Sequence, residues 1–270
     1  MIKTIRMLKM RTIKRTIKMS KFFSVDNKFF STINKIVDLL WLSFLWSVCC
    51  LPTIFLMIVF LVDFDKVGLL IIVFLPIAVI TMGPASAALY YAVVKSVRRD
   101  RSYATKCFFH GFKTNFKYGA ISSVILGFAT GILIVDYFWA AYSDTVDPNI
   151  GGLMSGAFIG VGIFVLFTLI WINPLLSRFD LKLKELFKNA LILSVKNFFR
   201  TIIMGAFWVG LAYLFLHFFQ YIYQYIIFIP FVLPGVSALL RSFVIEPVFK
   251  RITGDPNEDS ENEVDAWYAE

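Results

Sequence analysis

Four ionisable side chains stand inside long apolar segments, where they are candidates for ion pairing or for transport. They are Asp38, Asp136, Arg241 and Glu246. An ionisable residue at membrane depth is costly, and by default it is a candidate functional site. Arg241 and Glu246 are five residues apart and project about 140° from each other on a helix, so they are poor partners. Asp38 stands at a depth that matches Arg241, and it is the candidate partner.

Depth favours a structural role for these side chains. At about 1.5 Å per residue, Arg241 lies about 10 Å from the inner end of its segment at Val248, so its side chain can extend to the cytosol. We therefore expect structural anchoring for Arg241 and Asp136, with a functional site as the alternative. No segment carries a chain of carboxylates resembling a proton relay.

The sequence shows no pattern typical of enzymatic or metal chemistry. No Ser/His/Asp set, metal-ligand spacing or phosphate-binding loop is visible. His110 and His217 are far apart, and Cys49 and Cys50 are adjacent residues, whose geometry disfavours a disulfide. These observations predict a protein that is not an enzyme and that uses no cofactor or metal.

The composition indicates a membrane protein. Of the 270 residues, 59% are hydrophobic and only 17% are charged. A soluble domain has about 45–50% apolar and about 25% charged residues, so an ordinary soluble enzyme, a disordered chain and a disulfide scaffold are all disfavoured. The predicted class is an all-α membrane protein.

Hydropathy divides the chain into about six apolar segments, each long enough to cross a bilayer. A basic arm, residues 1–35, precedes the six-span bundle of residues 36–252, and an acidic, disordered tail, residues 253–270, follows it. The expected spans are 36–62, 67–94, 118–142, 150–172, 201–221 and 226–248.

The positive charges predict the orientation of these spans. Of 27 Lys and Arg residues, 10 lie in residues 1–35, 7 in 95–117 and 6 in 178–200, and all but Lys66 fall on one side of the predicted membrane. Because Lys and Arg are enriched in cytoplasmic loops, both termini are expected to be cytoplasmic. The net charge of +9 therefore indicates contact with anionic lipids at the cytoplasmic face, and no nucleic-acid partner. Met1 and Met19 are both candidates for the true start.

Two basic segments between spans are amphipathic. In residues 102–117 the phenylalanines Phe108, Phe112 and Phe116 recur at helical spacing, and in residues 181–200 apolar residues from Leu183 to Val195 recur every four positions. This pattern is typical of helices that lie in the membrane interface. We expect two such cytoplasmic-side interfacial helices; the alternative is that each segment extends the next span into the cytosol.

Glycines spaced by four indicate how the helices pack. Gly127 and Gly131 lie in the third span, and Gly152, Gly156 and Gly160 lie in the fourth. Such spacing puts the glycines on one helix face, where backbones can approach closely. It predicts a tight contact between the third and fourth spans, with self-association of the whole protein as the alternative.

Several short motifs together resemble the YesL-like family, the bacterial membrane proteins of domain-of-unknown-function family 624. The resemblance covers roughly residues 21–252, and the long hairpin after Leu51-Pro52 and the basic arm depart from the family pattern. The motifs are Thr81-Met82-Gly83-Pro84-Ala85 with Ala88-Leu89-Tyr90-Tyr91, FFHGFKTNFK with Asn115, Arg178-Phe179-Asp180, and PFVLPGVSALLRSF with Pro234 and Gly235.

The resemblance implies a multi-pass protein of the bacterial plasma membrane. Family members are often encoded beside sugar-uptake transporters, which implies a sugar-transporter component as a candidate partner. We therefore expect a non-enzymatic accessory or scaffold protein. The alternative is a small transporter or channel, since Gly83-Pro84 and Pro234-Gly235 could break the second and sixth spans and line a cavity. A polar cavity between these spans would favour transport, and a dry bundle would favour scaffolding.

Overall fold

The computed structural model describes residues 28–55, 71–98, 103–143, 147–218 and 229–253. These residues form helices and contain no strand, which confirms the all-α prediction. In chain order the elements are α2 (Lys28–Cys49), α5 (Ile71–Ala78), α6 (Met82–Ala92), the π-helical η1 (Val93–Arg98), α7 (Ala104–Tyr142), α8 (Pro148–Arg178), α9 (Leu183–Lys196), α10 (Phe198–His217) and α12 (Ile229–Thr253).

Within the described ranges, five helical stretches are long and apolar enough to cross a membrane. Helices α9 and α10 meet the same test only as a bent pair, with 98° between them, and would raise the total to six. The second predicted span comprises three elements, because a turn at residues 79–81 separates α5 from α6 and η1 continues α6. The protein therefore has the helices of a multi-pass membrane protein, as predicted.

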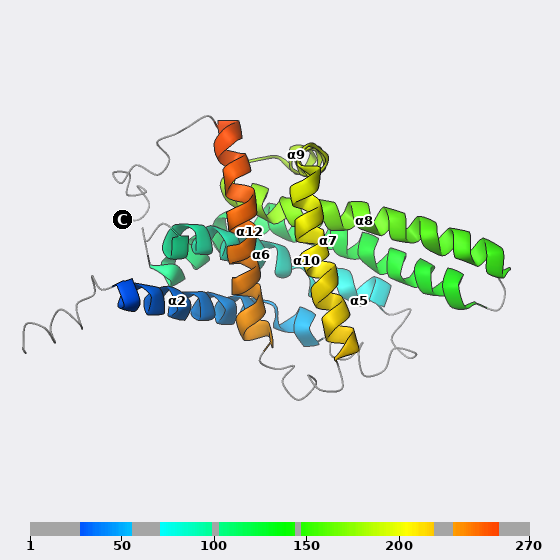
Figure 1. The fold of residues 1–270 in the computed structure, drawn as a ribbon, viewed down its shortest axis with the longest axis horizontal. Coiled ribbons are helices and arrows are strands. Elements are labelled where there is room, and N and C mark those ends of the chain that lie inside the picture. The colour runs from blue at the N-terminus through cyan, green and yellow to red at the C-terminus, as the bar shows by residue number, and fades with distance from the viewer. Residues whose placement is uncertain (1–27, 56–70, 99–102, 144–146, 219–228, 254–270) are drawn as a thin grey trace, which may run out of the picture.

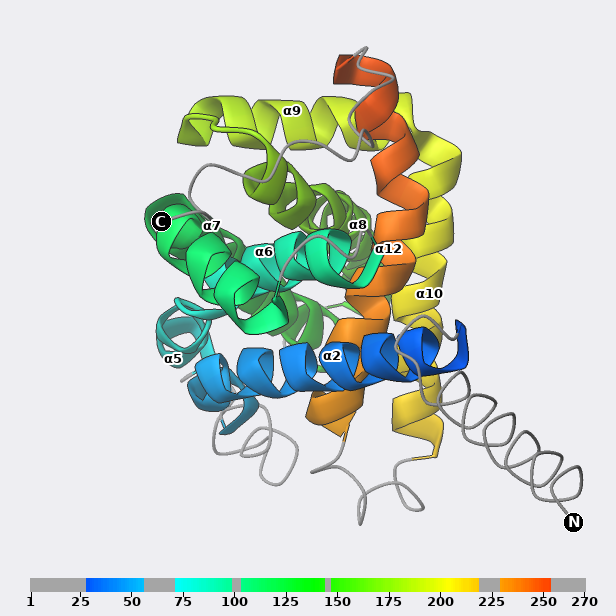
Figure 2. The same cartoon turned by 90° about the vertical axis from the view of Figure 1, so that its left-hand side faces the viewer.

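The long helices form two groups that cross each other. Helices α7 and α8 lie side by side, whereas α10 and α12 run across them in both views (Figure 1 and Figure 2). Helix α6 lies between the groups and contacts α7, α8, α2 and α12. Neighbouring helices can pack closely around α6 because many of its side chains are small. Four of its alanines are fully buried: Ala85, Ala87, Ala88 and Ala92.

The first predicted interfacial helix does not form as a separate element. Residues 104–117 are continuous with the third span in the 39-residue helix α7, so the alternative of an extended span holds here. The physical reason is burial: Cys107 and Phe108 are fully buried against α6 and η1. A segment that packs into the protein core cannot also lie free on the membrane surface.

The second predicted interfacial helix does form as a separate element, α9. Asn197, in a non-helical conformation, separates it from α10. Its buried apolar residues are not those of the predicted stripe, in which apolar residues recur every four positions from Leu183 to Val195. Leu186, Ala190 and Leu193 are buried, whereas Leu191 and Val195, two members of that stripe, are exposed.

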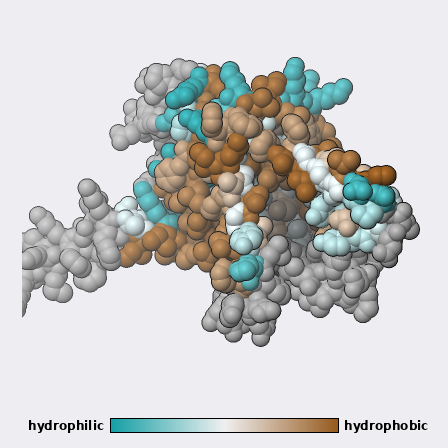
Figure 3. All heavy atoms as spheres, turned by 45° about the vertical axis from the view of Figure 1, so that its right-hand side comes forward, coloured by the Kyte–Doolittle hydropathy of each residue, from teal (hydrophilic) through white to brown (hydrophobic). Residues whose placement is uncertain are grey.

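Apolar side chains dominate one face of the molecule. Figure 3 shows hydrophobic atoms over most of the described surface in this view, with hydrophilic atoms along the upper edge, where Figure 1 places α9 and the end of α12, and in smaller groups elsewhere, including the right-hand edge. Such a surface fits contact with lipid. The predicted acidic tail from residue 254 on, most of the basic arm and the outer loop that holds Lys66 lie outside the described residues.

Candidate buried polar site

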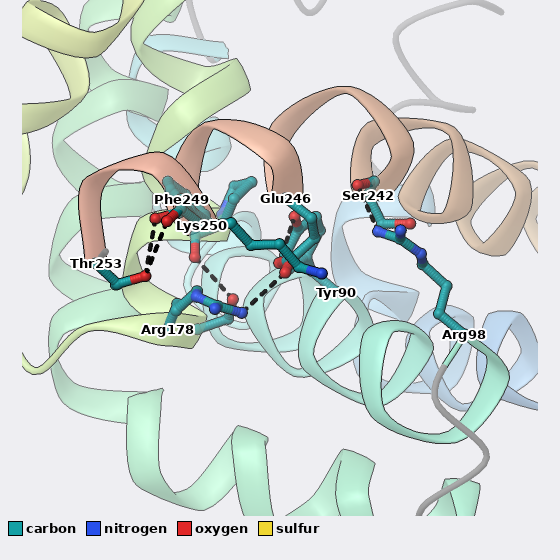
Figure 4. Close-up of polar contacts among 10 residues, drawn as sticks. Tyr90, Arg98, Arg178, Ser242, Glu246, Phe249, Lys250 and Thr253 are labelled. Atoms are coloured by element: carbon teal, nitrogen blue, oxygen red, sulfur yellow. Dashed lines mark hydrogen bonds and ion pairs between the residues drawn. The ribbon is translucent and has the colours of Figure 1, made fainter. Parts of the chain in front are cut away.

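An ion pair lies at the junction of three helices. Glu246 of α12 is 2% exposed, and its Oε2 is 2.8 Å from Nη1 of Arg178 at the end of α8 (Figure 4). The hydroxyl of Tyr90, which is on α6, donates a hydrogen bond of 3.1 Å to Oε1 of the same carboxylate. We call Tyr90, Arg178 and Glu246 the ionic cluster.

The ionic cluster joins the second, fourth and sixth predicted spans. A buried charge is expensive to remove from water, so it needs both an opposite charge and further hydrogen bonds. Both carboxylate oxygens of Glu246 accept a hydrogen bond, Oε1 from the Tyr90 hydroxyl and Oε2 from Nη1 of Arg178. The Arg178 guanidinium also lies 5.9 Å from the centre of the Phe249 ring. Because Tyr90, Arg178 and Glu246 come from different helices, the cluster holds those helices in one relative position.

A second arginine joins the second span to α12. Nη1 of Arg98, the last residue of η1, donates a hydrogen bond of 2.8 Å to the backbone carbonyl of Ser242 (Figure 4). Its guanidinium lies 4.9 Å from the centre of the Phe243 ring. Arg98 was expected only as one of many cations of a basic loop, and its contact with α12 depends on how η1 packs.

Arg241 is 8% exposed, so the predicted extension of its side chain to the cytosol is wrong. Its Nε donates a long hydrogen bond of 3.4 Å to the Ser237 carbonyl, and its guanidinium lies 5.9 Å from the Trp208 ring of α10. Asp38 is not among its partners, so the expected pairing of the two is also wrong. Packing of α12 against α2, α6 and α10 encloses the arginine before it can reach a membrane surface.

The remaining predicted ionisable sites are less enclosed. Asp38 on α2 and Asp136 on α7 are both half-buried. Asp136 is 17 residues along α7 from Gly119, which contacts α6, and this spacing corresponds to about 25 Å of helix. Of the four predicted positions, Arg241 and Glu246 share α12, and Glu246 pairs with Arg178, in agreement with the expectation that Arg241 and Glu246 are poor partners.

The glycine of the second-span motif is a point of close helix contact. A Cβ atom added to Gly83 would collide with the carbonyl oxygen of Gly119 and with Oγ of Ser123, both on α7. The backbone nitrogen of Gly83 also donates a hydrogen bond of 3.2 Å to Oγ of Ser123. Pro84 is in the first turn of α6, where proline is tolerated, and it lies against Gly119.

The glycine of the last-span motif makes an equivalent contact with α2. A Cβ atom on Gly235 would lie 2.7 Å from the Leu39 carbonyl oxygen and would collide with Oγ of Ser43. The backbone nitrogen of Gly235 donates a hydrogen bond of 2.9 Å to that hydroxyl. The neighbouring Pro234 is buried inside α12. Two hydroxyl groups, those of Ser43 and Ser123, thus satisfy backbone nitrogens at the two glycines.

Two further motif residues make local contacts only. Nδ2 of Asn115 donates a hydrogen bond of 3.0 Å to the Gly111 carbonyl, one turn earlier in α7. Oγ1 of Thr81 is buried and has no hydrogen-bond partner in the described part of the chain. Neither residue belongs to the ionic cluster.

The predicted glycine contact between the third and fourth spans is wrong for α8. A Cβ atom added at any of the three glycines of the predicted stripe would meet nothing within 4 Å; these are Gly152, Gly156 and Gly160. Helices α7 and α8 do contact each other, but α8 turns other residues, such as Gly151 and Phe158, inward. Gly127 packs against Val79 near the turn before α6, and Gly131 is buried in α7.

Several residues of the junction could not be recognised as a site from the sequence. Tyr90 and Arg178 stand within motifs that carry the family resemblance, but nothing in their spacing connects them to Glu246. Trp208 and Gly119 carry no sequence signal of their role. Among the described residues, no group of three or more His, Cys, Asp or Glu side chains could hold a metal ion.

Comparison with known proteins supports the family resemblance. Residues 36–137 match the family model described as "Protein of unknown function, DUF624", which confirms the predicted family over this part of the chain. The match includes Tyr90 and the Gly83 contact, whereas Arg178, Arg241 and Glu246 lie beyond it. Searches of curated proteins and of solved structures gave no match.

Proposed function

We propose that this chain, whose residues 36–137 match DUF624, is a non-enzymatic accessory or scaffold protein of the bacterial plasma membrane. Its role would be to hold a partner membrane protein, and a component of a sugar-uptake transporter is the candidate. The family context supports the carbohydrate link. The orientation in this proposal is that predicted from the positive charges, with both termini in the cytoplasm.

The observation that carries the proposal is the packing at the glycines of the two span motifs. Gly83 and Gly235 are the positions that a transporter would use to line a cavity between the second and sixth spans. The turn at residues 79–81 interrupts the second span, whereas α12 runs without interruption from Ile229 to Thr253, so the expected break at Pro234-Gly235 is wrong. A neighbouring helix occupies the space at each glycine, α7 at Gly83 and α2 at Gly235. Close backbone contact at both positions supports a rigid packed junction, as a scaffold needs.

The ionic cluster adds to this support. Tyr90 and Glu246 connect α6 to α12, and Arg178 connects α12 to α8. Removing one partner of a buried ion pair is strongly destabilising, so the pair favours one arrangement of the helices that carry it. The polar residues between the second and sixth spans therefore support a structural role for that junction.

Helix α9 offers the surface with which a partner would interact. Its buried face packs on α8, while Leu191, Ile192 and Val195 are 41%, 47% and 63% exposed. Lys184 and Lys188 are exposed on the same helix. Apolar residues bordered by cations suit a partner that lies at the cytoplasmic surface of the membrane.

The test is affinity purification of the tagged full-length protein from native membranes. The wild-type protein should recover a transporter component, identified by mass spectrometry. Val195→Glu should lower the recovery of the partner because it places a negative charge in the exposed apolar face of α9. Ile252→Glu at the end of α12, whose parent side chain is 53% exposed and lies beyond the sixth predicted span, is the control and should leave the recovery unchanged. Consistent recovery of the protein alone would count strongly against the proposal.

A small transporter is the second candidate, and the burial of Arg241 is the observation in its favour. This arginine has no carboxylate partner among the described residues, as expected of a residue that meets an anionic solute. Proteoliposomes that contain the purified protein should then take up such a solute, and Arg241→Ala should change the flux. Absence of any flux above protein-free vesicles would leave the scaffold proposal in place.

A further inference from the structure

Arg241 lacks a counter-charge within the part of the chain that the structure describes. Its contacts are the Ser237 carbonyl, at 3.4 Å, and the face of the Trp208 ring. A guanidinium carries five N–H donors, and only Nε is engaged in a hydrogen bond. Its Nη nitrogens have no acceptor in the described ranges, and the residue is only 8% exposed. These nitrogens therefore still have N–H donors to offer a ligand.

The surroundings of Arg241 carry an excess of positive charge. Glu246 is engaged by Arg178, so that pair is neutral. Arg98 donates to the carbonyl of Ser242, the residue next to Arg241, and has no carboxylate partner in the described part of the chain. Arg98 thus brings a second positive charge without a counter-charge among the described residues to α12, at the residue that follows Arg241. Burying a cation without a counter-charge is costly, and an anion bound there would remove the cost.

The outward face of α12 beside this arginine is apolar. Leu240 and Phe243 are 37% and 56% exposed, and Val209 on α10 is 59% exposed. A site with a buried arginine and apolar side chains at its edge suits an amphiphilic anion. Basic sites between membrane helices bind the head groups of anionic phospholipids in this way.

We propose that Arg241 binds a phosphate group at the junction of α6, α10 and α12. The phosphate is carried either by an anionic phospholipid or by a soluble phosphate ester. Arginine suits this ligand because its planar fork can donate two parallel hydrogen bonds to a phosphate. The proposal goes beyond the scaffold function and does not depend on it.

The first arm of the test measures lipid binding by native mass spectrometry of the full-length protein in detergent. The wild-type protein should retain phosphatidylglycerol in preference to phosphatidylcholine at equal concentration. Arg241→Gln should reduce phosphatidylglycerol retention about tenfold, the loss expected for a hydrogen bond to a charged group. Arg251→Gln removes the same charge from an exposed position of α12 and should leave retention unchanged.

The second arm measures the midpoint of thermal unfolding with glycerol 3-phosphate and with inorganic phosphate. If the natural ligand is soluble, these compounds should stabilise the wild-type protein but not Arg241→Gln, and lipid retention should show no preference. Binding in neither arm would overturn the proposal. An equal loss for Arg241→Gln and Arg251→Gln would overturn it too, because it would indicate attraction by net charge alone.

A further variant keeps the test decisive if Arg241→Gln does not fold. Arg241→Lys retains the positive charge but not the planar fork, so retention should fall by a smaller factor than with glutamine. The wild-type protein provides the remaining check: if it shows no preference for phosphatidylglycerol and no stabilisation by either phosphate compound, the site does not exist.

Discussion

Two regions of the molecule use the same small residues with opposite results. Around α6 and α12, Gly83 and Gly235 are each in contact with a neighbouring backbone, Gly83 with that of α7 and Gly235 with that of α2. In the N-terminal half of α8, residues 148–164, Gly152, Gly156 and Gly160 have nothing within 4 Å of an added Cβ atom. The comparison teaches that a glycine stripe gives a helix the capacity for close approach without specifying a partner.

The same two regions differ in polar content. The junction contains the ionic cluster of Tyr90, Arg178 and Glu246, whereas α8 has no ionisable residue before its final Arg178. The exposed apolar side chains of α8, such as Leu153 and Phe164 at 78% and 60%, are suited to lipid. We therefore expect substitutions at the junction to cost stability and those in the N-terminal half of α8 to cost little.

The largest effect is expected for Glu246→Gln. This change leaves the mostly buried Arg178 without its counter-charge, and removal of one partner of a buried pair costs about 3–5 kcal/mol in the free energy of unfolding. Denaturant unfolding of the full-length protein in detergent provides the measurement, and Asp136→Asn is the control. A loss below about 1 kcal/mol for Glu246→Gln would show that the cluster does not hold the junction together.

The next effect is expected for Gly83→Ala. The new Cβ atom would collide with the backbone of Gly119, which cannot move aside as a flexible side chain can. Overpacking of this kind costs about 1–3 kcal/mol. Thermal unfolding should show a lower midpoint for Gly83→Ala, and likewise for Gly235→Ala, whose Cβ atom would collide with α2. Wild-type stability for both variants would contradict the close contacts described for the junction.

The smallest effect is expected for Gly156→Ala, the matched change in α8. Its Cβ atom meets open space, and alanine favours a helix over glycine by about 1 kcal/mol. The unfolding midpoint should therefore stay the same or rise. Cross-linking in native membranes, with Gly156→Ile added, tests the alternative that this stripe mediates self-association. A cross-linked dimer that isoleucine abolishes would show that the stripe is in contact with a second copy.

Much of the fold follows from local pattern. Runs of apolar residues predicted about six spans and the position of each, because a helix that crosses a bilayer must be about 20 residues long whatever its neighbours are. The extent of the interfacial helices was less predictable. Phe108 stands in an amphipathic pattern, yet it is buried against α6 and η1, and only the packing of those elements decides that residues 104–117 continue α7.

The candidate site was predictable in part. Glu246 and Arg241 stand out as ionisable residues in an apolar segment, and their spacing correctly excluded a pair between them. Their surroundings were not predictable, because Arg178 is 68 residues from Glu246 and Trp208 is 33 residues from Arg241. The cost of burying a charge depends on what lies within a few ångströms of it, and that is a property of tertiary packing.

The sequence by itself determined the class of the protein, its apolar helices, the asymmetry of its charges and its match to the DUF624 model over residues 36–137. Each of these depends on residues that are close together in the chain. The tertiary structure alone decided that Glu246 pairs with Arg178 and Tyr90, that Arg241 is enclosed, and that Gly83 is in contact while Gly156 is not. Helix periodicity defines the faces of a helix, but only packing selects which face meets a neighbour.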